Sequence, residues 1–315
     1  MSATPRHHHY LPQCYLKGFS KAQSKKSKIQ VYDFRRNKHF ETIARNVGGE
    51  RDFNRIDLEG VDPTGLETRF ASFEGELAKS LARVNEKKAL SEEDRMYVLN
   101  LAAMMLLRTP QMRQHWRQNL SSLAETIMSV QLSSEGAFEA SRQEMLEGGY
   151  EGPDVTFEEA KDFFERKEYT FNVKREYHIY MELQMLIPTI EALSQRNWLL
   201  LHTDDKTDPF ITSDNPVILT WKNPEDIPPF YRNSPGLAMS DTSVYFPVSS
   251  RVMLVGEFEI SEAVSEAGSD FVALANGMVC STAHERVFAP RSTFRFKGPG
   301  GIEKGKDVMK YVNPE

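Results

Sequence analysis

The sequence predicts an α+β fold in which a mainly antiparallel sheet packs against a central helical block. Short apolar runs with the period-two alternation of strands occupy both ends of the chain, whereas apolar residues three or four positions apart fill its middle. Because the strands come before and after the helices and do not alternate with them, βαβ units are not expected. The 315 residues, 40% hydrophobic and 27% charged, are typical of a folded globular chain, which we expect to be a single large domain.

Residues 1–60 are predicted to form a basic part that contains β-structure. Residues 29–34 alternate between apolar and polar side chains, and the polar run Arg35-Arg36-Asn37-Lys38 that follows is typical of a hairpin turn. Residues 1–55 hold twelve Lys or Arg and four Asp or Glu, a net charge of +8, which leaves −14 for the rest of the chain. This region either contacts nucleic-acid phosphates through residues such as Lys25, Lys26 and Lys28, or lies against an acidic surface of its own chain.

Residues 61–195 are predicted to form the helical block. Ser91 is followed by three acidic residues and Thr156 has a glutamate three positions later, so both are expected to cap the start of a helix. The Gly- and Pro-containing segment 148–153 predicts a loop between two of the helices. Pro110 and Pro188 fall inside helical patterns and are expected to end or kink them.

Residues 196–296 are predicted to be rich in strands and to contain one helix. Short apolar runs punctuated by Pro and Asp-Asn signals indicate the strands, and residues 269–284 have helical spacing with Asn276 on the apolar face. The tail, residues 297–315, is rich in Gly, Lys and Pro and is expected to fray.

Several classes of protein are not expected. Cys14 and Cys280 are too few for a disulfide framework or a zinc ribbon, and no apolar signal segment opens the chain, so we expect a cytoplasmic protein. The longest nearly apolar run, residues 96–107, is too short to cross a bilayer, so no membrane partner is expected. Neither a dinucleotide-binding nor a P-loop glycine motif occurs.

The first candidate site residue is His9, in the run His7-His8-His9 that precedes an amphipathic aromatic stretch. An imidazole held at the edge of a packed segment can serve as a general base, a metal ligand or a phosphate contact. The alternative is that one histidine is a hydrogen-bonded core residue and the others are solvated.

Motifs spread along the chain resemble the domain-of-unknown-function family numbered 4238. They are His9-x-x-Pro12-x-x-Tyr15-Leu16-x-x-Phe19, Arg51-Asp52-Phe53, Glu74, Arg108-x-Pro110 and Ile211-Thr212-Ser213-Asp214-Asn215-Pro216-Val217. The resemblance covers nearly the whole chain and implies a bacterial, intracellular protein without an established activity. It also implies that aromatic residues are common at the positions of Cys14 and Asn54, so a nucleophilic role for Cys14 is not expected.

The Ser213-Asp214-Asn215-Pro216 element is predicted to form a sharp turn at a strand end. Asp214 there is a candidate metal ligand or orienting carboxylate, with Ser213 and Asn215 as substrate-binding neighbours. The alternative is that these side chains only satisfy backbone amides of the turn.

Glu74 and Arg108 are charged residues at the edge of apolar helical faces, where each needs a partner. They either form a structural ion pair or act separately, with Arg108 or Arg51 holding a phosphate and Glu74 ligating a metal or taking a proton. Asn276, a candidate for substrate binding, and His178, in the predicted helix 175–186, are weaker candidates, the alternative for each being a satisfied polar group in the core.

Two functional hypotheses follow, and the sequence leaves open whether the protein is an enzyme. In the first, His9, Glu74, Arg108 and Asp214 meet at a cleft of a metal-dependent phosphodiesterase or nuclease. Asp214 and Glu74 would hold a divalent metal ion, His9 would activate water, and Arg108 or Arg51 would neutralise the phosphorane. In the second, the protein is a non-catalytic sensor module that binds nucleic acid or a protein partner, for nucleic acid through the basic N-terminal region.

Overall fold

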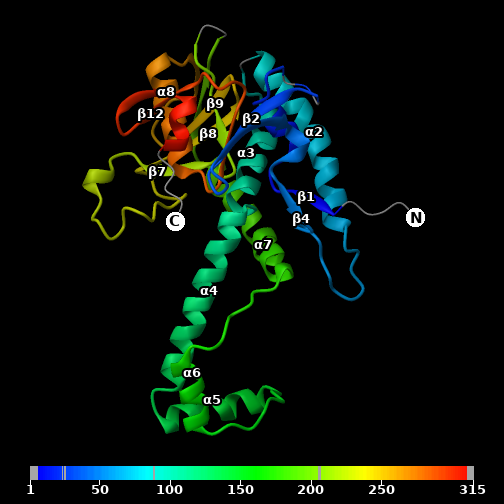
Figure 1. Cartoon of the computed structure of the whole chain (residues 1–315), viewed down its shortest axis with the longest axis vertical. Coiled ribbons are helices and arrows are strands. Elements are labelled where there is room, and N and C mark those ends of the chain that lie inside the picture. Colours follow the sequence, from blue (N-terminus) through cyan, green and yellow to red (C-terminus); the bar gives the residue numbers. More distant parts are fainter. Residues whose placement is uncertain (1–5, 23, 25, 88, 205–206, 311–315) are drawn as a thin grey trace.

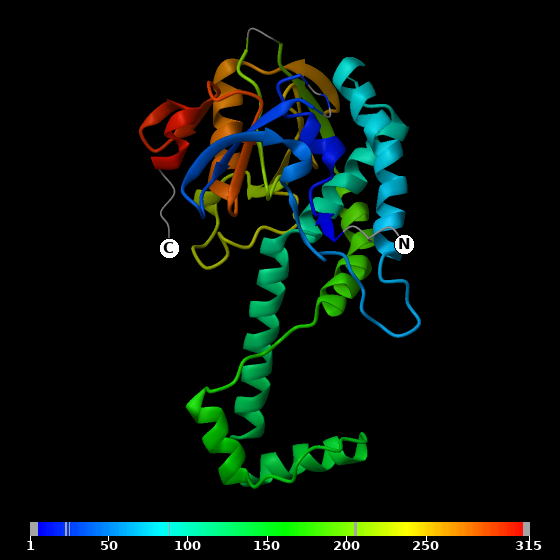
Figure 2. The same ribbon diagram turned by 45° about the vertical axis from the view of Figure 1, so that its right-hand side comes forward.

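Strands and most helices gather in one body, and a helical arm projects from it (Figure 1). The computed structural model describes residues 6–310 except 23, 25, 88 and 205–206. The two views in Figures 1 and 2 agree that the long helix α4 leads from the body to the far end of the arm. In the described part of the chain, none of the helices is long and apolar enough to span a bilayer.

The N-terminal part contains the predicted hairpin. Its elements are β1 (His7–His9), α1 (Gln13–Lys17), β2 (Lys28–Asp33), β3 (Lys38–Ile43), η1 (Ala44–Asn46) and β4 (Gly49–Arg51). Strands β2 and β3 pair in antiparallel register on either side of the basic turn, as the alternation of residues 29–34 predicts. Strand β1 pairs antiparallel with β4, so the histidine run lies beside the Arg51-Asp52-Phe53 motif.

The middle of the chain is helical, as predicted. Its helices are α2 (Gly65–Lys87), α3 (Glu92–Leu107), α4 (Pro110–Gln131), α5 (Glu135–Glu147), α6 (Phe157–Arg166) and α7 (Arg175–Ser194). The hydroxyls of Ser91 and Thr156 cap α3 and α6, and Thr156 forms a full capping box with Glu159. Pro110 ends the α3 pattern and becomes the first residue of α4, whereas α7 continues through Pro188.

The C-terminal part contributes all of a five-stranded sheet and two strands of a four-stranded sheet. Its elements are β5 (Asn197–His202), β6 (Thr212–Ser213), β7 (Ile218–Trp221), η2 (Pro224–Asp226), β8 (Thr242–Ser249), β9 (Val252–Glu257), β10 (Ala263–Glu266), α8 (Ser269–Thr282), β11 (Arg286–Ala289), β12 (Arg295–Gly298), β13 (Gly301–Lys304) and η3 (Gly305–Lys310). The strand orders are β10-β5-β9-β8-β7 and β3-β2-β11-β6, and within them only the β10–β5 pair is parallel. The mainly antiparallel character predicted from the sequence is confirmed, but the strands divide among a five-stranded sheet, a four-stranded sheet and the two-stranded pairs β1–β4 and β12–β13.

The tail differs from its predicted frayed state. Strands β12 and β13 form an antiparallel hairpin, and Val308 of η3 is buried with Phe294 and Phe296. The hairpin lies against α8 at Gly277, where an added Cβ would come within 2.4 Å of the carbonyl oxygen of Lys297. The predicted fraying is therefore prevented, up to residue 310, by contacts with a helix distant in sequence.

The histidine-aromatic motif anchors the N-terminal part to the rest of the body. Tyr15, Leu16 and Phe19 are fully buried in the largest apolar cluster, which also contains residues of α2, α3 and β8. The Tyr15 hydroxyl donates to the carbonyl oxygen of Pro247 (2.8 Å) and lies 2.6 Å from Oγ1 of Thr212. The first motif of the chain is thus bonded directly to the strand that precedes Asp214.

Candidate functional site

A surface cavity of about 350 Å³ lies where the N-terminal part, α4, α7 and the start of β11 meet. We call it the arginine pocket, after its five lining arginines, Arg35, Arg51, Arg113, Arg117 and Arg175. Its other lining residues are Glu50, Asp52, Phe53, Pro110, Gln114, Val173, His178, His284 and Glu285. Of the candidate site residues selected from the sequence, Arg51 and His178 line it, and Asp52, Phe53 and Pro110 of the family motifs line it too.

Separate elements bring these arginines together. Arg35 lies in the β2–β3 turn, Arg51 ends β4, and Arg175 begins α7. Arg113 and Arg117 are one turn apart on α4, so they lie on the same side of that helix. The direction of α4 is set at its start, where Pro110 breaks the preceding helix and the Thr109 hydroxyl accepts a hydrogen bond from the backbone N–H of Met112 (3.1 Å).

Most of the arginine charges already have carboxylate partners. Arg113 is buried and forms a bidentate pair with Glu182, at 2.5 Å from Nε and 3.0 Å from Nη2. Arg35 pairs with Glu285 at 3.0 Å, and Arg175 pairs with Asp57 at 2.6 Å.

Arg51 and Arg117 are the arginines that remain available to a ligand. Arg51 is exposed, and its Nε is 3.7 Å from the nearest carboxylate oxygen, that of Asp52. Arg117 is also exposed, and none of the residues that the structure describes forms an ion pair or hydrogen bond with it. The pocket therefore presents two cations that an anion can contact without first breaking a close ion pair.

His178 is the most unusual polar group of the pocket. Its side chain is only 3% exposed, yet neither ring nitrogen has a hydrogen-bond partner among the described residues. Burial lowers the pKa of His178 to about 4, and the positive charges of Arg113 and Arg117 act in the same direction. Near neutral pH it is a neutral imidazole with an unused N–H donor and an unused acceptor, and such groups are expected to find partners.

Arg108 does not line the pocket and is not paired with Glu74. Its Nη2 donates to Oδ1 of Asn54 (3.1 Å), and its guanidinium carbon is 3.6 Å from the centre of the Phe70 ring. Burial lowers the pKa of Arg108 to about 10, so it remains charged at neutral pH. No ion pair between Arg108 and Glu74 exists in the described structure. The structural pair considered from the sequence is thus replaced by a hydrogen bond to an amide and a contact with an aromatic ring.

Glu67, which the sequence motifs do not indicate, is the common neighbour of His9, Glu74 and Arg108. Its carboxylate accepts a hydrogen bond from Nδ2 of Asn54 and acts on the pKa of all three groups. Burial raises the pKa of Glu74 to about 7, against the attraction of Arg108. Burial lowers the pKa of His9, whose Nε2 donates to the carbonyl oxygen of Arg45 (3.2 Å). Glu67 precedes Glu74 by seven residues on α2, a spacing that places both on one helical face.

Asp214 belongs to a different set of contacts. Its buried carboxylate accepts hydrogen bonds from the backbone N–H groups of His284 (2.9 Å), Glu285 (2.8 Å) and Arg286 (2.9 Å). Burial raises the pKa of Asp214 to about 6, although these three bonds act in the opposite direction. Because His284 and Glu285 line the arginine pocket, Asp214 holds one wall of the pocket in place.

The three remaining sequence-predicted residues are engaged in hydrogen bonds with backbone groups. Ser213 Oγ accepts from the backbone N–H of Asn215 (3.1 Å), and Asn215 Nδ2 donates to the carbonyl oxygen of Thr282 (3.0 Å). Asn276 accepts from the N–H of Ile211 and donates to two carbonyl oxygens. The bonds of Asn215 and Asn276 join α8 to segments beside it, and the substrate-binding role of all three residues stays a prediction.

The family comparison agrees with the motifs. A family model described as "Protein of unknown function (DUF4238)" matches residues 7–293. The chain belongs to this family. The matched range in this DUF4238 chain includes every residue of the arginine pocket, together with His9, Glu74, Arg108 and Asp214. Searches of curated proteins and of solved structures found no match.

The two carboxylates proposed as metal ligands in the DUF4238 chain have different neighbours. Charged groups around Glu74 are Arg108, Glu67 and Lys17, whereas Asp214 is bonded to the backbone at the start of β11. Among the described residues, no three His, Cys, Asp or Glu side chains are placed to hold a metal ion. Burial also raises the pKa of Cys14 to about 12, which keeps it a thiol.

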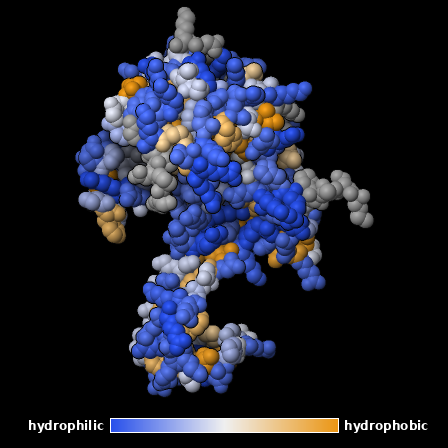
Figure 3. All heavy atoms as spheres, viewed as in Figure 1, coloured by the Kyte–Doolittle hydropathy of each residue, from blue (hydrophilic) through white to orange (hydrophobic). Residues whose placement is uncertain are grey.

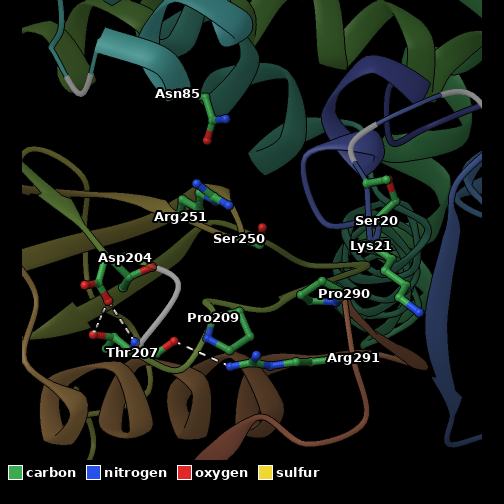
Figure 4. Close-up of a pocket in the computed structure, with 12 residues that line it drawn as sticks. Ser20, Lys21, Asn85, Asp204, Thr207, Pro209, Ser250, Arg251, Pro290 and Arg291 are labelled. Atoms are coloured by element: carbon green, nitrogen blue, oxygen red, sulfur yellow. Dashed lines mark hydrogen bonds between the residues drawn. The ribbon is translucent and has the colours of Figure 1, made fainter.

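A second cavity, of about 500 Å³, lies among loops of the body (Figure 4). Its cationic residues are Lys21, Arg251 and Arg291. Arg291 reaches the carbonyl oxygen of Thr207 (3.5 Å), and the Asp204 carboxylate accepts from the backbone N–H and hydroxyl of the same threonine (Figure 4). No residue selected from the sequence lines this cavity, so the arginine pocket is the better candidate site.

Proposed function

We propose that this DUF4238 chain is a recognition module that binds phosphate groups of a nucleic acid in the arginine pocket. The observation that carries the proposal is the convergence of Arg51, whose nearest carboxylate is 3.7 Å away, and Arg117 beside the buried His178; neither Arg117 nor the His178 ring has a hydrogen-bond or ion-pair partner among the described residues. Arginine guanidinium groups bind phosphate through two parallel hydrogen bonds, and a neutral imidazole N–H adds a donor that carries no charge.

A nucleic acid fits this pocket better than an isolated phosphate. Arg35 and Arg51 belong to the N-terminal region, residues 1–55, whose net charge is +8. A polyanion can contact the pocket and this region together and release counterions from both. Of the lysines expected to contribute, Lys26 is exposed, Lys28 pairs with Glu41 at 2.7 Å, and Lys25 lies outside the described residues.

Recognition is preferred over metal-dependent hydrolysis because of where the candidate catalytic groups lie. His9 and Glu74 surround Glu67 and do not line the arginine pocket, and the Asp214 carboxylate is bonded to three backbone N–H groups. A nuclease would need a base and metal ligands next to the bound phosphate.

Fluorescence anisotropy with labelled single-stranded DNA and RNA oligonucleotides tests the proposal. Binding should weaken linearly on a plot of log K against log salt concentration, and Arg51→Ala or Arg117→Ala should each lower the slope by about 1. The matched control is Arg69→Ala, which removes an exposed arginine of α2 that does not line the pocket.

Two results would overturn the proposal. One is the absence of binding at low salt by correctly folded protein. The other is an equal loss of slope in Arg69→Ala. Incubation of the same oligonucleotides with Mg²⁺ or Mn²⁺ separates binding from hydrolysis, because cleavage that Glu74→Gln abolishes would favour the nuclease hypothesis instead.

A further inference from the structure

The arm, which we define as residues 118–174, has almost no core of its own: among its described residues, Leu132 alone is buried. Neither α5 nor α6 buries a side chain in the described structure. Helices of 13 and 10 residues are marginal in water unless an apolar face packs against something. Figures 1 and 2 show the far end of the arm well away from the body, which therefore cannot supply that packing.

The outer side of α4 carries an apolar stripe. It consists of Leu123, Ile127 and Val130, which are 56%, 48% and 65% exposed and are spaced four and three residues apart. A different side of the helix, with Met128 and Leu132, faces α5 and α6 across a cavity of about 650 Å³. The stripe is thus a second apolar face, and Figure 3 shows apolar residues at the surface of the arm.

Helix α7 carries a matching stripe on the body. Tyr177, Tyr180, Leu183 and Ile187 are 43%, 55%, 44% and 60% exposed at helical spacing. The other side of α7, which includes Ile179 and Leu193, is buried, and α7 packs on α3. Because α4 leads away from the body whereas α7 lies against it (Figures 1 and 2), the two stripes of one chain do not cover each other.

Charge complementarity indicates what covers the apolar stripes of α4 and α7. The arm holds five Lys or Arg and twelve Asp or Glu, a net charge of −7, whereas residues 1–55 have a net charge of +8. The α7 stripe begins beside Arg175 and His178, which line the arginine pocket together with Arg35 and Arg51 of that basic region. An acidic arm laid along the α7 stripe would therefore lie next to a basic surface.

We propose that the covering partner is a second copy of this chain. The α4 stripe of each copy packs on the α7 stripe of the other, in a two-fold pairing that uses both stripes twice. The same contact brings the acidic arm of each copy toward the basic N-terminal region of its partner. This inference does not depend on nucleic-acid binding.

Sedimentation velocity of the full chain, with an arm variant and a matched control, tests the pairing. The arm variant combines Leu123→Glu, Ile127→Glu and Val130→Glu. The control combines Gln118→Glu, Ser122→Glu and Ser129→Glu, which make the same charge change on the polar side of the same helix. The parent chain and the control should have about twice the 36.1 kDa chain mass at micromolar concentration. The arm variant should associate at least ~100-fold more weakly, because it loses three apolar contacts in each half of the interface.

A mixing experiment tests whether the α4 stripe of each copy packs on the α7 stripe of the other. A second variant combines Tyr180→Glu, Leu183→Glu and Ile187→Glu on α7, and alone it should also be monomeric. An equimolar mixture with the arm variant should form dimers where neither variant does, because one of the two arm–α7 contacts is then intact. The pairing is refuted if the parent chain is monomeric at ~100 μM or if the control dissociates like the arm variant. A mixture that stays monomeric refutes the packing of the α4 stripe of one copy on the α7 stripe of the other.

Discussion

The buried Arg113–Glu182 pair allows a sharp test of how the arginine pocket is built. Glu182→Gln would keep the shape of the side chain but leave the guanidinium without a counter-charge in a site where the two side chains are 9% and 2% exposed. Breaking a buried pair in this way costs about 3–5 kcal/mol. Divided by the entropy of unfolding of a 315-residue chain, this free-energy loss corresponds to a decrease of about 5–8 °C in melting temperature.

Thermal and urea denaturation of three variants measure this cost. The double variant Arg113→Met with Glu182→Leu removes both charges, so its free energy of unfolding should fall less than that of Glu182→Gln, by about 1–3 kcal/mol. The main cause of this smaller loss is that the carbonyl oxygen of Phe53 no longer accepts its 2.7 Å hydrogen bond from Arg113. Glu191→Gln makes the same substitution at an exposed position of α7 and should be nearly neutral. The reasoning is refuted if Glu182→Gln costs less than ~1 kcal/mol, or if the double replacement is the more damaging.

Three further predictions concern single residues. Asp214→Asn should destabilise the fold by about 2–4 kcal/mol in urea denaturation, because one amide oxygen replaces two carboxylate oxygens that accept three N–H bonds; a loss below ~0.5 kcal/mol would contradict this. The pKa of Glu74 rises from 4.5 to about 7 on folding, so its contribution to stability falls as pH rises through that window. Glu74→Gln should therefore be more stable than the parent by about 1–3 kcal/mol at pH 8 and little changed at pH 4, and parallel pH profiles of the two proteins would contradict this. The pKa of His178 falls from 6.5 to about 4, so its contribution to stability is lost as pH falls through that window. In His178→Phe that loss should be absent from the denaturation profile, and an unchanged profile would argue against a buried neutral imidazole.

The local elements of the fold could be predicted from the sequence because their signals are local. Caps such as Ser91 and Thr156, and the alternation of residues 29–34, depend only on neighbours in the chain. The order of residues 297–310 could not be predicted in this way. It depends on the burial of Val308 and on the close approach to Gly277, which are contacts with distant parts of the chain.

The candidate site was predictable only in part, for the same reason. Arg51 was noticed because it belongs to a motif, but Arg117 and Arg175 are ordinary charged residues of helices until the fold brings them to one cavity. His9, Glu74 and Arg108 do share a neighbour, Glu67, although they do not line that cavity. A motif shows which residues are distinctive, whereas convergence on a cavity is a property of the fold.

The pairing of β2 with β11 has a consequence for how the protein matures during synthesis. Val31 is opposite Phe288, so the second strand of the chain has no partner on that side until nearly all of the polypeptide has been made. At about 5–20 residues per second, that interval lasts roughly 12–50 s. Throughout it, an unpaired strand from a strongly basic segment is open to nucleic acid, chaperones or other nascent chains. Truncation before Arg286 would make this exposure permanent.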